Sequence, residues 1–349
     1  LIDLYTDKWD WDILSGNISL PWSEALIDRY ADKWRWVSLS YQPLPWSEAL
    51  IDRFADKWDW GLLSYQPLPW SETLIDLYTD KWDWEKLSRN KSIPLSEALI
   101  DRYADKWPWK SLSYKPLPWS EAFIDRYADK WDWSSLSMSE SLPWTEALID
   151  RYADKWDWGW LTMNESLPWT EALIDRYADK WDWNSLGGNE SLPWTEALID
   201  RYANKWGFRR FNKRLINMRS WYGLSTNESL PWSESLIDRY ADKWDWGGLS
   251  KNETLPWTEV LINRYVDKWL FGAKHSRTVS SYGLSGNQSL PWSESLIDRY
   301  ADKWDWDLLT QNSGIPWTES IIKHYSDNWN WYGLSGNQSL PWSESLIDR

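Results

Sequence analysis

The sequence predicts an all-α solenoid built from tandem helix-turn-helix repeats of about 24–25 residues, forming an elongated rod or superhelix. Three observations predict this fold class. Pro recurs every 24 or 25 residues over most of the 349-residue chain, and nearly always within Leu-Pro-Trp. A Ser or Thr stands two residues after each of these prolines, and apolar residues follow at helical spacing. A period between 20 and 50 residues is typical of solenoids and arrays.

The spacing of the prolines predicts one continuous repeat array over residues 1–349, with about 13 units. Leu1 corresponds to Leu26 of the next unit, and Arg349 corresponds to Arg29. We therefore expect the array to be cut mid-unit at both ends, as a segment of a longer array. Two wider gaps between prolines predict loop insertions near 207–220 and 270–280.

The first helix of each unit is predicted to begin at the Ser or Thr after Pro-Trp, such as Ser23, because a hydroxyl suits a helix N-cap. Leu26, Ile27, Tyr30 and Trp34 then fall at i, i+1, i+4 and i+8. This spacing gives one apolar face on a helix of about twelve residues.

The second helix is predicted to be only one or two turns long, and its pattern is clearest at residues 83–90. Asp83 suits the N-cap, Trp84 and Leu87 lie three residues apart, and Asn90 suits a left-handed position at the helix end. Such a hairpin cannot bury its own apolar face, so it must stack on neighbouring repeats.

Charges on the first helix predict contacts between successive repeats. Asp28 and Asp32 are four residues apart, and like charges at this spacing mildly destabilise an isolated helix. The layout is favourable if they face Arg53 and Lys57 of the next unit. The alternative is that all four side chains are solvated.

The chain contains 38 Trp, about three in each unit. Burying one Trp contributes about 5 kcal/mol, and so small a unit needs this contribution to offset the entropy of ordering its backbone. Most Trp residues are therefore expected in the core. The alternative is that some are exposed platforms on which sugars or other rings stack.

Asn-x-Ser/Thr is a candidate acceptor pattern for N-glycosylation if the protein is secreted. It occurs at Asn17, Asn90, Asn164, Asn189, Asn227, Asn252, Asn287 and Asn337. The alternative interpretation is structural, because the Asn would end the second helix and the Ser or Thr would begin the next turn.

The two insertions are basic on an otherwise acidic chain, which makes them candidate partner-binding loops, for instance for another copy of the chain. Their candidate residues are Arg209, Arg210, Lys213, Arg214, Lys274 and Arg277. A tolerated surface loop without a binding role is the alternative.

Composition excludes several classes of function. The net charge of −15 argues against nucleic acid, and no apolar run is long enough to insert into a membrane. The chain has no Cys, only two His, and no phosphate-binding loop or metal-ligand spacing. We therefore expect no catalytic, metal-binding or cofactor-binding residues, no cofactor, and no enzymatic activity.

The run at residues 44–64, Leu-Pro-Trp-Ser-Glu-Ala-Leu-Ile-Asp-Arg-Phe-Ala-Asp-Lys-Trp-Asp-Trp followed by Gly-Leu-Leu-Ser, recurs at 142–162 with Thr for both Ser residues, Tyr for Phe and Trp for one Leu. It resembles Trp-rich tandem repeats of largely uncharacterised bacterial and some viral or protist proteins. The resemblance covers nearly the whole chain except the insertions. It implies an array architecture and brings no catalytic residues. In shape alone, the hairpins are also similar to those of tetratricopeptide-type solenoids.

These observations favour a non-enzymatic structural repeat protein, a segment of a longer array or of an extracellular or cell-surface filament. Its expected partner is another copy of itself or a different protein. Two alternatives stay open at this point, namely a protein-binding solenoid scaffold and a glycosylated or glycan-binding surface protein.

Overall fold

The computed structural model describes residues 2–206, 223–272 and 283–342, and every regular element within these ranges is a helix. The protein is an all-α solenoid of tandem helix-turn-helix repeats, which confirms the predicted fold class. The chain divides into two compact units. Unit 1 comprises residues 1–143 and 151–156, and unit 2 comprises residues 144–150 and 157–349.

Unit 1 alternates short helices of two kinds, each 3 to 6 residues long. In chain order they are η1 (Asp3–Tyr5), α1 (Trp11–Ser15), α2 (Glu24–Arg29), α3 (Trp36–Leu39), α4 (Glu48–Arg53), α5 (Trp60–Leu63), α6 (Glu72–Leu77), α7 (Trp84–Arg89), α8 (Glu97–Arg102), α9 (Trp109–Ser113), α10 (Glu121–Arg126) and α11 (Trp133–Ser137). Helix α12 (Glu146–Arg151) lies at the division between the units.

Unit 2 continues the same alternation. Its helices are α13 (Trp158–Met163), α14 (Glu171–Arg176), α15 (Trp183–Leu186), α16 (Glu196–Arg201), η2 (Leu224–Thr226), α17 (Glu234–Arg239), α18 (Trp246–Leu249), α19 (Glu259–Arg264), α20 (Gly283–Gly286), α21 (Glu294–Arg299), α22 (Trp306–Gln311), α23 (Glu319–His324) and α24 (Trp331–Ser335). The predicted insertions near 207–220 and 270–280 fall largely outside the described residues.

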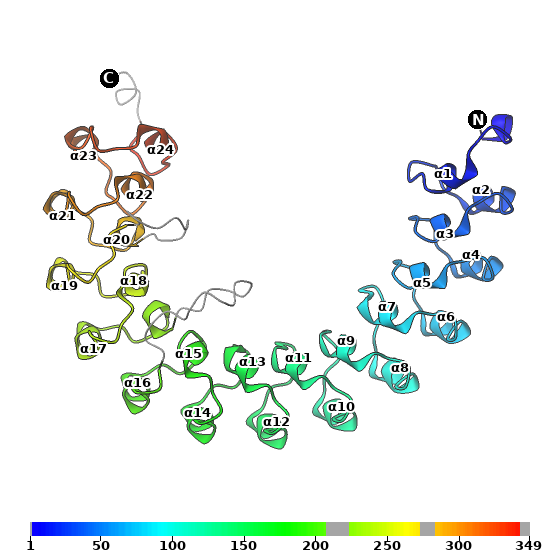
Figure 1. The fold of residues 1–349 in the computed structure, drawn as a ribbon, viewed down its shortest axis with the longest axis horizontal. Helices are drawn as coiled ribbons and strands as arrows, with labels where there is room; N and C mark the ends of the chain where they lie inside the picture. The colour runs from blue at the N-terminus through cyan, green and yellow to red at the C-terminus, as the bar shows by residue number, and fades with distance from the viewer. Residues whose placement is uncertain (1, 207–222, 273–282, 343–349) are drawn as a thin grey trace. The chain divides into compact units, whose positions relative to one another are not determined.

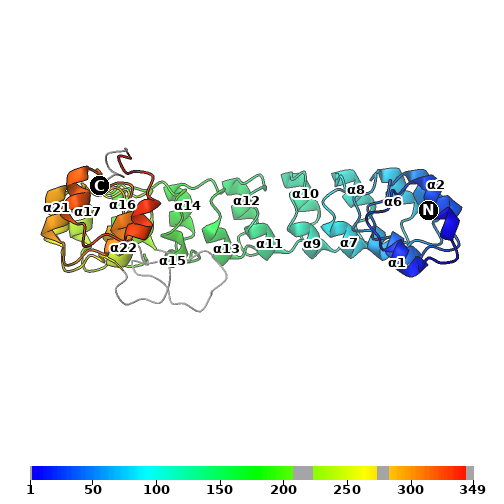
Figure 2. The same ribbon diagram turned by 90° about the horizontal axis from the view of Figure 1, so that it is seen from above.

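Within each unit the two kinds of helix form two rows, and both views show this arrangement (Figures 1 and 2). We call the helix after each recurring Pro the A helix, as in α4, and the next helix along the chain the B helix, as in α5. Neighbouring B helices pack on one another, for example α7 on α9 and α20 on α22. Each repeat therefore buries its apolar face against the repeats before and after it.

The A helices begin as predicted but end earlier. The Ser47 hydroxyl accepts a hydrogen bond from the Leu50 N–H (3.0 Å), as expected of an N-cap. The prediction of about twelve residues is wrong, because α2 has only six. Tyr30 leaves the helical conformation (φ −121°, ψ 29°), and the N–H groups of Lys33 and Trp34 both bond to its carbonyl, which forms a tight turn.

The B helices have the predicted length of one to two turns, and most of them have the predicted Asp N-cap. The Asp83 carboxylate accepts a hydrogen bond from the Lys86 N–H (3.1 Å). The left-handed position predicted for Asn90 is wrong, because this residue is extended (φ −68°, ψ 124°). Among the described residues no side-chain-bearing residue has positive φ.

The core lies between the two rows of helices within each unit. One repeat contributes Leu50 and Ile51 from its A helix, Trp58 from the turn and Leu63 from its B helix, all at most 5% exposed. The same positions are buried in the other described repeats except at Ile2 and Leu26, which are half-buried, and at Trp9, which is exposed. The apolar face predicted for the A helix is therefore confirmed in the inner repeats.

Candidate functional site

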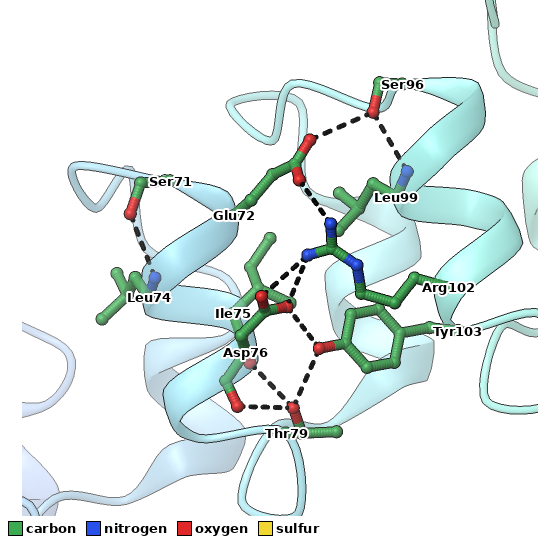
Figure 3. A network of polar contacts seen from close by, with 10 residues as sticks. All are labelled: Ser71, Glu72, Leu74, Ile75, Asp76, Thr79, Ser96, Leu99, Arg102 and Tyr103. Atoms are coloured by element: carbon green, nitrogen blue, oxygen red, sulfur yellow. Dashed lines mark hydrogen bonds and ion pairs between the residues drawn. The ribbon is translucent and has the colours of Figure 1, made fainter.

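The interface between successive A helices gathers most of the charged side chains, and Figure 3 shows it between α6 and α8. Two acidic residues of α6, Glu72 and Asp76, face α8. The Arg102 guanidinium bonds to both, with Nη2 3.0 Å from Glu72 Oε2 and Nη1 2.7 Å from Asp76 Oδ2. One arginine therefore holds two carboxylates of the preceding repeat, with charge-assisted hydrogen bonds.

Two hydroxyl groups complete this interface. The Ser96 hydroxyl caps α8 and also lies 3.4 Å from Glu72 Oε1, to which it donates. The Tyr103 hydroxyl donates to Asp76 and lies 3.2 Å from the Thr79 hydroxyl. Ser96 and Tyr103 thus bond to the preceding repeat, and Ser96 also caps the helix of its own repeat.

These bonds recur from repeat to repeat between equivalent atoms. Arginine pairs with the Asp of the preceding repeat at Arg53–Asp28, Arg102–Asp76, Arg126–Asp101, Arg151–Asp125, Arg176–Asp150, Arg201–Asp175, Arg239–Asp200 and Arg264–Asp238. Tyrosine donates to the Asp at this position at Tyr78–Asp52, Tyr127–Asp101, Tyr152–Asp125, Tyr177–Asp150, Tyr202–Asp175, Tyr240–Asp200 and Tyr265–Asp238. The ladder predicted from Asp28 and Arg53 is therefore confirmed.

The electrostatics of each junction follow from this geometry. The hydrogen bond from Tyr103, together with that from Arg102, lowers the pKa of Asp76 below its ordinary value. Burial raises the pKa of Tyr78 to about 12, and the hydrogen bond to Asp52 acts in the same direction. The junction therefore favours an ionised Asp and a neutral Tyr at neutral pH.

The predicted contacts between Lys and Asp of successive repeats form less regularly than those between Arg and Asp. Lys57, expected opposite Asp32, donates instead to the Ala31 carbonyl (3.2 Å). Lys106 does pair with the Asp of the preceding repeat, Asp80, at 2.8 Å, but that carboxylate is 94% exposed. Pairs this exposed contribute little to stability.

The tryptophans have three distinct positions in each repeat. The one after Asp-Lys, such as Trp82, is buried except at Trp9, while those after Pro and after Trp-Asp, such as Trp70 and Trp60, are half-buried in most repeats. Trp82 packs on Trp70 of its own repeat (ring centroids 5.0 Å apart) and on Trp60 of the preceding one (4.7 Å). The expectation of core tryptophans is confirmed for the first position.

The indole N–H groups satisfy backbone carbonyls at the helix ends, a role that sequence reasoning missed. Trp58 Nε1 donates to the Ile51 carbonyl (3.1 Å) in the last turn of α4, and Trp60 Nε1 donates to Ala55 (3.0 Å). A six-residue helix leaves most of its carbonyls without a partner inside the helix. The available signal in the sequence was the constant spacing, because each Trp follows the residue whose carbonyl it bonds to by seven or by five positions.

The Asn-x-Ser/Thr asparagines lie on the B-helix side, and seven of the eight are buried, with Asn17 exposed. Asn90 Nδ2 donates to the carbonyls of Ser64 and Gln66 in the preceding repeat (both 2.9 Å), while its Oδ1 accepts from the Ser92 N–H (2.9 Å). The equivalent donors are Nδ2 of Asn189, Asn227, Asn252, Asn287 and Asn337. An N-linked glycan would be attached to this nitrogen and would need space around it. At these buried positions the nitrogen bonds to the preceding repeat, which explains the recurrence of Asn there without invoking a glycan.

A Ser or Thr near the end of most B helices also joins the repeats, and sequence reasoning missed it. The Ser64 hydroxyl donates to the Trp60 carbonyl in its own helix (2.6 Å) and accepts from the Asp83 N–H of the next repeat (3.1 Å). The residue recurs after Leu, as at Ser40, Ser250 and Thr310. That repetition was the signal, because a buried hydroxyl requires partners.

The candidate partner-binding residues Arg209, Arg210, Lys213, Arg214, Lys274 and Arg277 lie outside the described residues. In the described ranges no helix has the length and apolar character needed to cross a membrane. No group of three or more His, Cys, Asp or Glu side chains within these ranges is placed to hold a metal ion.

The geometry of the repeats gives most junctions between described repeats two different faces, one carrying Glu and Asp carboxylates and the other carrying Ser or Thr, Arg and Tyr. Comparison with protein-family models, with curated proteins and with solved structures finds no match for this chain.

Proposed function

We propose that this chain is a non-enzymatic structural repeat protein, working as part of an extended array or filament. The observation that supports the proposal most directly is the recurrence of one set of bonds, between equivalent atoms, from junction to junction. Asp and Tyr side chains can provide acid-base chemistry in enzymes. In this chain Asp76 and Tyr103 instead bond to each other across the junction between two repeats.

The two faces of a repeat differ, so each junction is head-to-tail. A head-to-tail contact whose rotation does not close on itself generates an open assembly and not a fixed-size oligomer. Added repeats meet the same carboxylates on one side and the same Arg and Tyr on the other. This property suits a protein whose function is to extend.

A glycan-decorated surface protein is less well supported as a function. The amide nitrogens of six candidate asparagines, including Asn90 and Asn189, bond to carbonyls of the preceding repeat. Asn17, which is exposed, is the candidate with space for a glycan. A mass measurement of the protein from its native source would show whether any of these sites carries sugar.

The proposal is tested by following assembly against concentration, using sedimentation velocity and negative-stain electron microscopy. We expect linear particles that lengthen with concentration and share the width of the single chain. A single species of one-chain mass at every concentration would contradict self-assembly.

A tandem fusion provides the reference for an extended array. Arg349 and Leu4 occupy equivalent positions in the repeat, so a second copy joined to Arg349 from Tyr5 onward keeps the repeat in phase. We expect the fusion to keep the helical content per residue and to protect backbone amides at the join as strongly as at internal junctions. Unprotected amides at the join would show that the array does not extend in this way.

A further inference from the structure

One junction in unit 1 departs from the repeat at Leu95. The residue after the recurring Pro is Trp in every other unit, and Leu95 is the single exception. Elsewhere this Trp packs on the buried Trp of its own repeat, as Trp70 does on Trp82. The side chain of Leu95 has no aromatic ring and no N–H group.

The backbone carbonyl that should receive this indole has a different partner. In unit 2 the Asn189 carbonyl accepts from Trp194 Nε1 (3.0 Å) and from Asn227 Nδ2 (3.3 Å). The equivalent carbonyl of Asn90 accepts instead from Lys115 Nζ (2.9 Å). At this carbonyl the ammonium group of Lys115 is therefore the donor, in place of the indole and amide groups that donate in unit 2.

A hollow of about 1050 Å³ opens at this junction, between α7 and α9. Its apolar lining includes Ile93, Leu95, Trp109 and the ring of Tyr114. Its volume is close to the upper end of the range for small-molecule sites, about 300–1,000 Å³. The space is concave and partly apolar, as sites for small ligands usually are.

The hollow is positively charged, unlike the chain as a whole. Lys91, Lys110 and Lys115 line it, and each is the only cation at its position among the repeats. The other charged lining residues, Glu85 and Arg89, pair with each other at 2.5 Å. The three lysines therefore give the hollow its net positive charge.

The position of Lys115 indicates that these charges are not independent. Burial lowers the pKa of its ammonium group, and the charge of Lys91 lowers it further. A bound anion would relieve this repulsion. This junction therefore lacks the indole ring of the other repeats and has three lysines around the apolar gap.

We propose that this hollow binds a small aromatic carboxylate. The aromatic ring would lie against Leu95 and Trp109, in place of the missing indole, and the carboxylate would bond to the ammonium groups of Lys91, Lys110 and Lys115. The site requires only the junction between α7 and α9, so the proposal is independent of the array proposed above.

The test measures binding of 3-indolepropionate to the whole chain, by calorimetry and by saturation-transfer NMR on the probe. We expect saturable binding that weakens at high salt, because charge supplies part of the affinity. Free indole lacks the carboxylate and inorganic phosphate lacks the ring, so each should bind at least tenfold more weakly. Equal binding of either compound would overturn the proposed ligand chemistry.

Two variants locate the site. Leu95→Trp restores the residue of the other repeats and fills the gap, so it should fold as the parent chain does and lose at least tenfold in affinity. Lys110→Gln removes one exposed cation and should weaken binding several-fold without changing the circular dichroism spectrum. Undiminished affinity in Leu95→Trp, or no saturable binding to the parent chain, would overturn the proposal.

Discussion

At the scale of single residues, tryptophan serves as both a core side chain and a hydrogen-bond donor. Phe could fill much of the same space, as the buried Phe271 does at the second Trp position of Trp-x-Trp. Phe has no group that can satisfy the carbonyls at the end of a six-residue helix. This second role explains why a chain with so few Phe carries so many Trp.

Two adjacent repeats allow this role to be measured. Trp58 and Trp82 are equally buried and pack on equivalent rings, but Trp58 Nε1 donates to Ile51, whereas Trp82 Nε1 has no acceptor in the structure. Both Trp→Phe variants lose packing. Only Trp58→Phe also loses a buried hydrogen bond, so it should be less stable than Trp82→Phe by about 1 kcal/mol in urea unfolding. Equal losses would show that the indole N–H contributes nothing measurable.

At the scale of elements, the helices are too short to be stable alone, since isolated helices below about 12–15 residues are marginal in water. Their ends are therefore completed by neighbouring repeats. The B-helix hydroxyl is the clearest case, because one Ser bonds to its own helix and to the N–H of the residue that caps the next B helix. Helix formation and stacking are thus coupled.

A matched pair of serines tests this coupling. Ser64 and Ser88 are both fully buried, but only Ser64 bonds across the junction, because the residue facing Ser88 is Pro108, which has no N–H. Ser64→Ala should therefore leave the Asp83 N–H without a partner and cost about 1 kcal/mol more than Ser88→Ala. Thermal unfolding of both variants measures the difference, and a larger loss in Ser88→Ala would contradict the assignment.

The sequence was sufficient to predict the elements themselves. Repetition gave the fold class, the hydroxyl positions gave the A-helix starts, and the Asp28–Arg53 spacing gave the ladder between repeats. The A-helix length was wrong because Trp34 keeps an apolar period past the helix end, where the chain has already turned. The roles of Tyr78 and Asn90 were missed because hydrogen bonds between repeats depend on a stacking geometry that local patterns do not specify.

At the scale of the whole molecule, the core that the described residues form is divided among the repeats of each unit. Each repeat contacts its neighbours, so stability is expected to be nearly a sum of repeat terms and junction terms. A severe local defect should then unfold a neighbourhood and leave distant repeats folded. This behaviour differs from that of a globular domain, which unfolds as one unit.

Ile124→Asp tests this expectation, because Ile124 in α10 is fully buried and an unpaired charge there is strongly destabilising. Hydrogen exchange should show lost protection in α8 to α11, while α19 and α21 in unit 2 keep the protection of the parent chain. Matched exposed controls are Asp105→Asn and Asp179→Asn, which should change nothing. Loss of protection over the entire chain would contradict nearest-neighbour stability.

The repeated Tyr–Asp bond should make the whole array sensitive to alkaline pH. Burial, with the hydrogen bond to Asp, raises the pKa to about 12 for Tyr78, Tyr127, Tyr152, Tyr202, Tyr240 and Tyr265. The ordinary value is 10.0, so the folded state favours the neutral phenol. The corresponding stability is fully present below pH 10 and is lost as the pH rises through about 12.

Urea unfolding followed by circular dichroism at several pH values checks this. We expect the free energy of unfolding to fall between pH 10 and pH 12. Lysines also lose their charge in this range, so the control is a variant with Phe at positions 78, 127 and 152, which Phe54 shows to be compatible with the packing. That variant should start less stable and lose less on going from pH 10 to pH 12. An identical loss in both proteins would assign the alkaline sensitivity to the lysines instead.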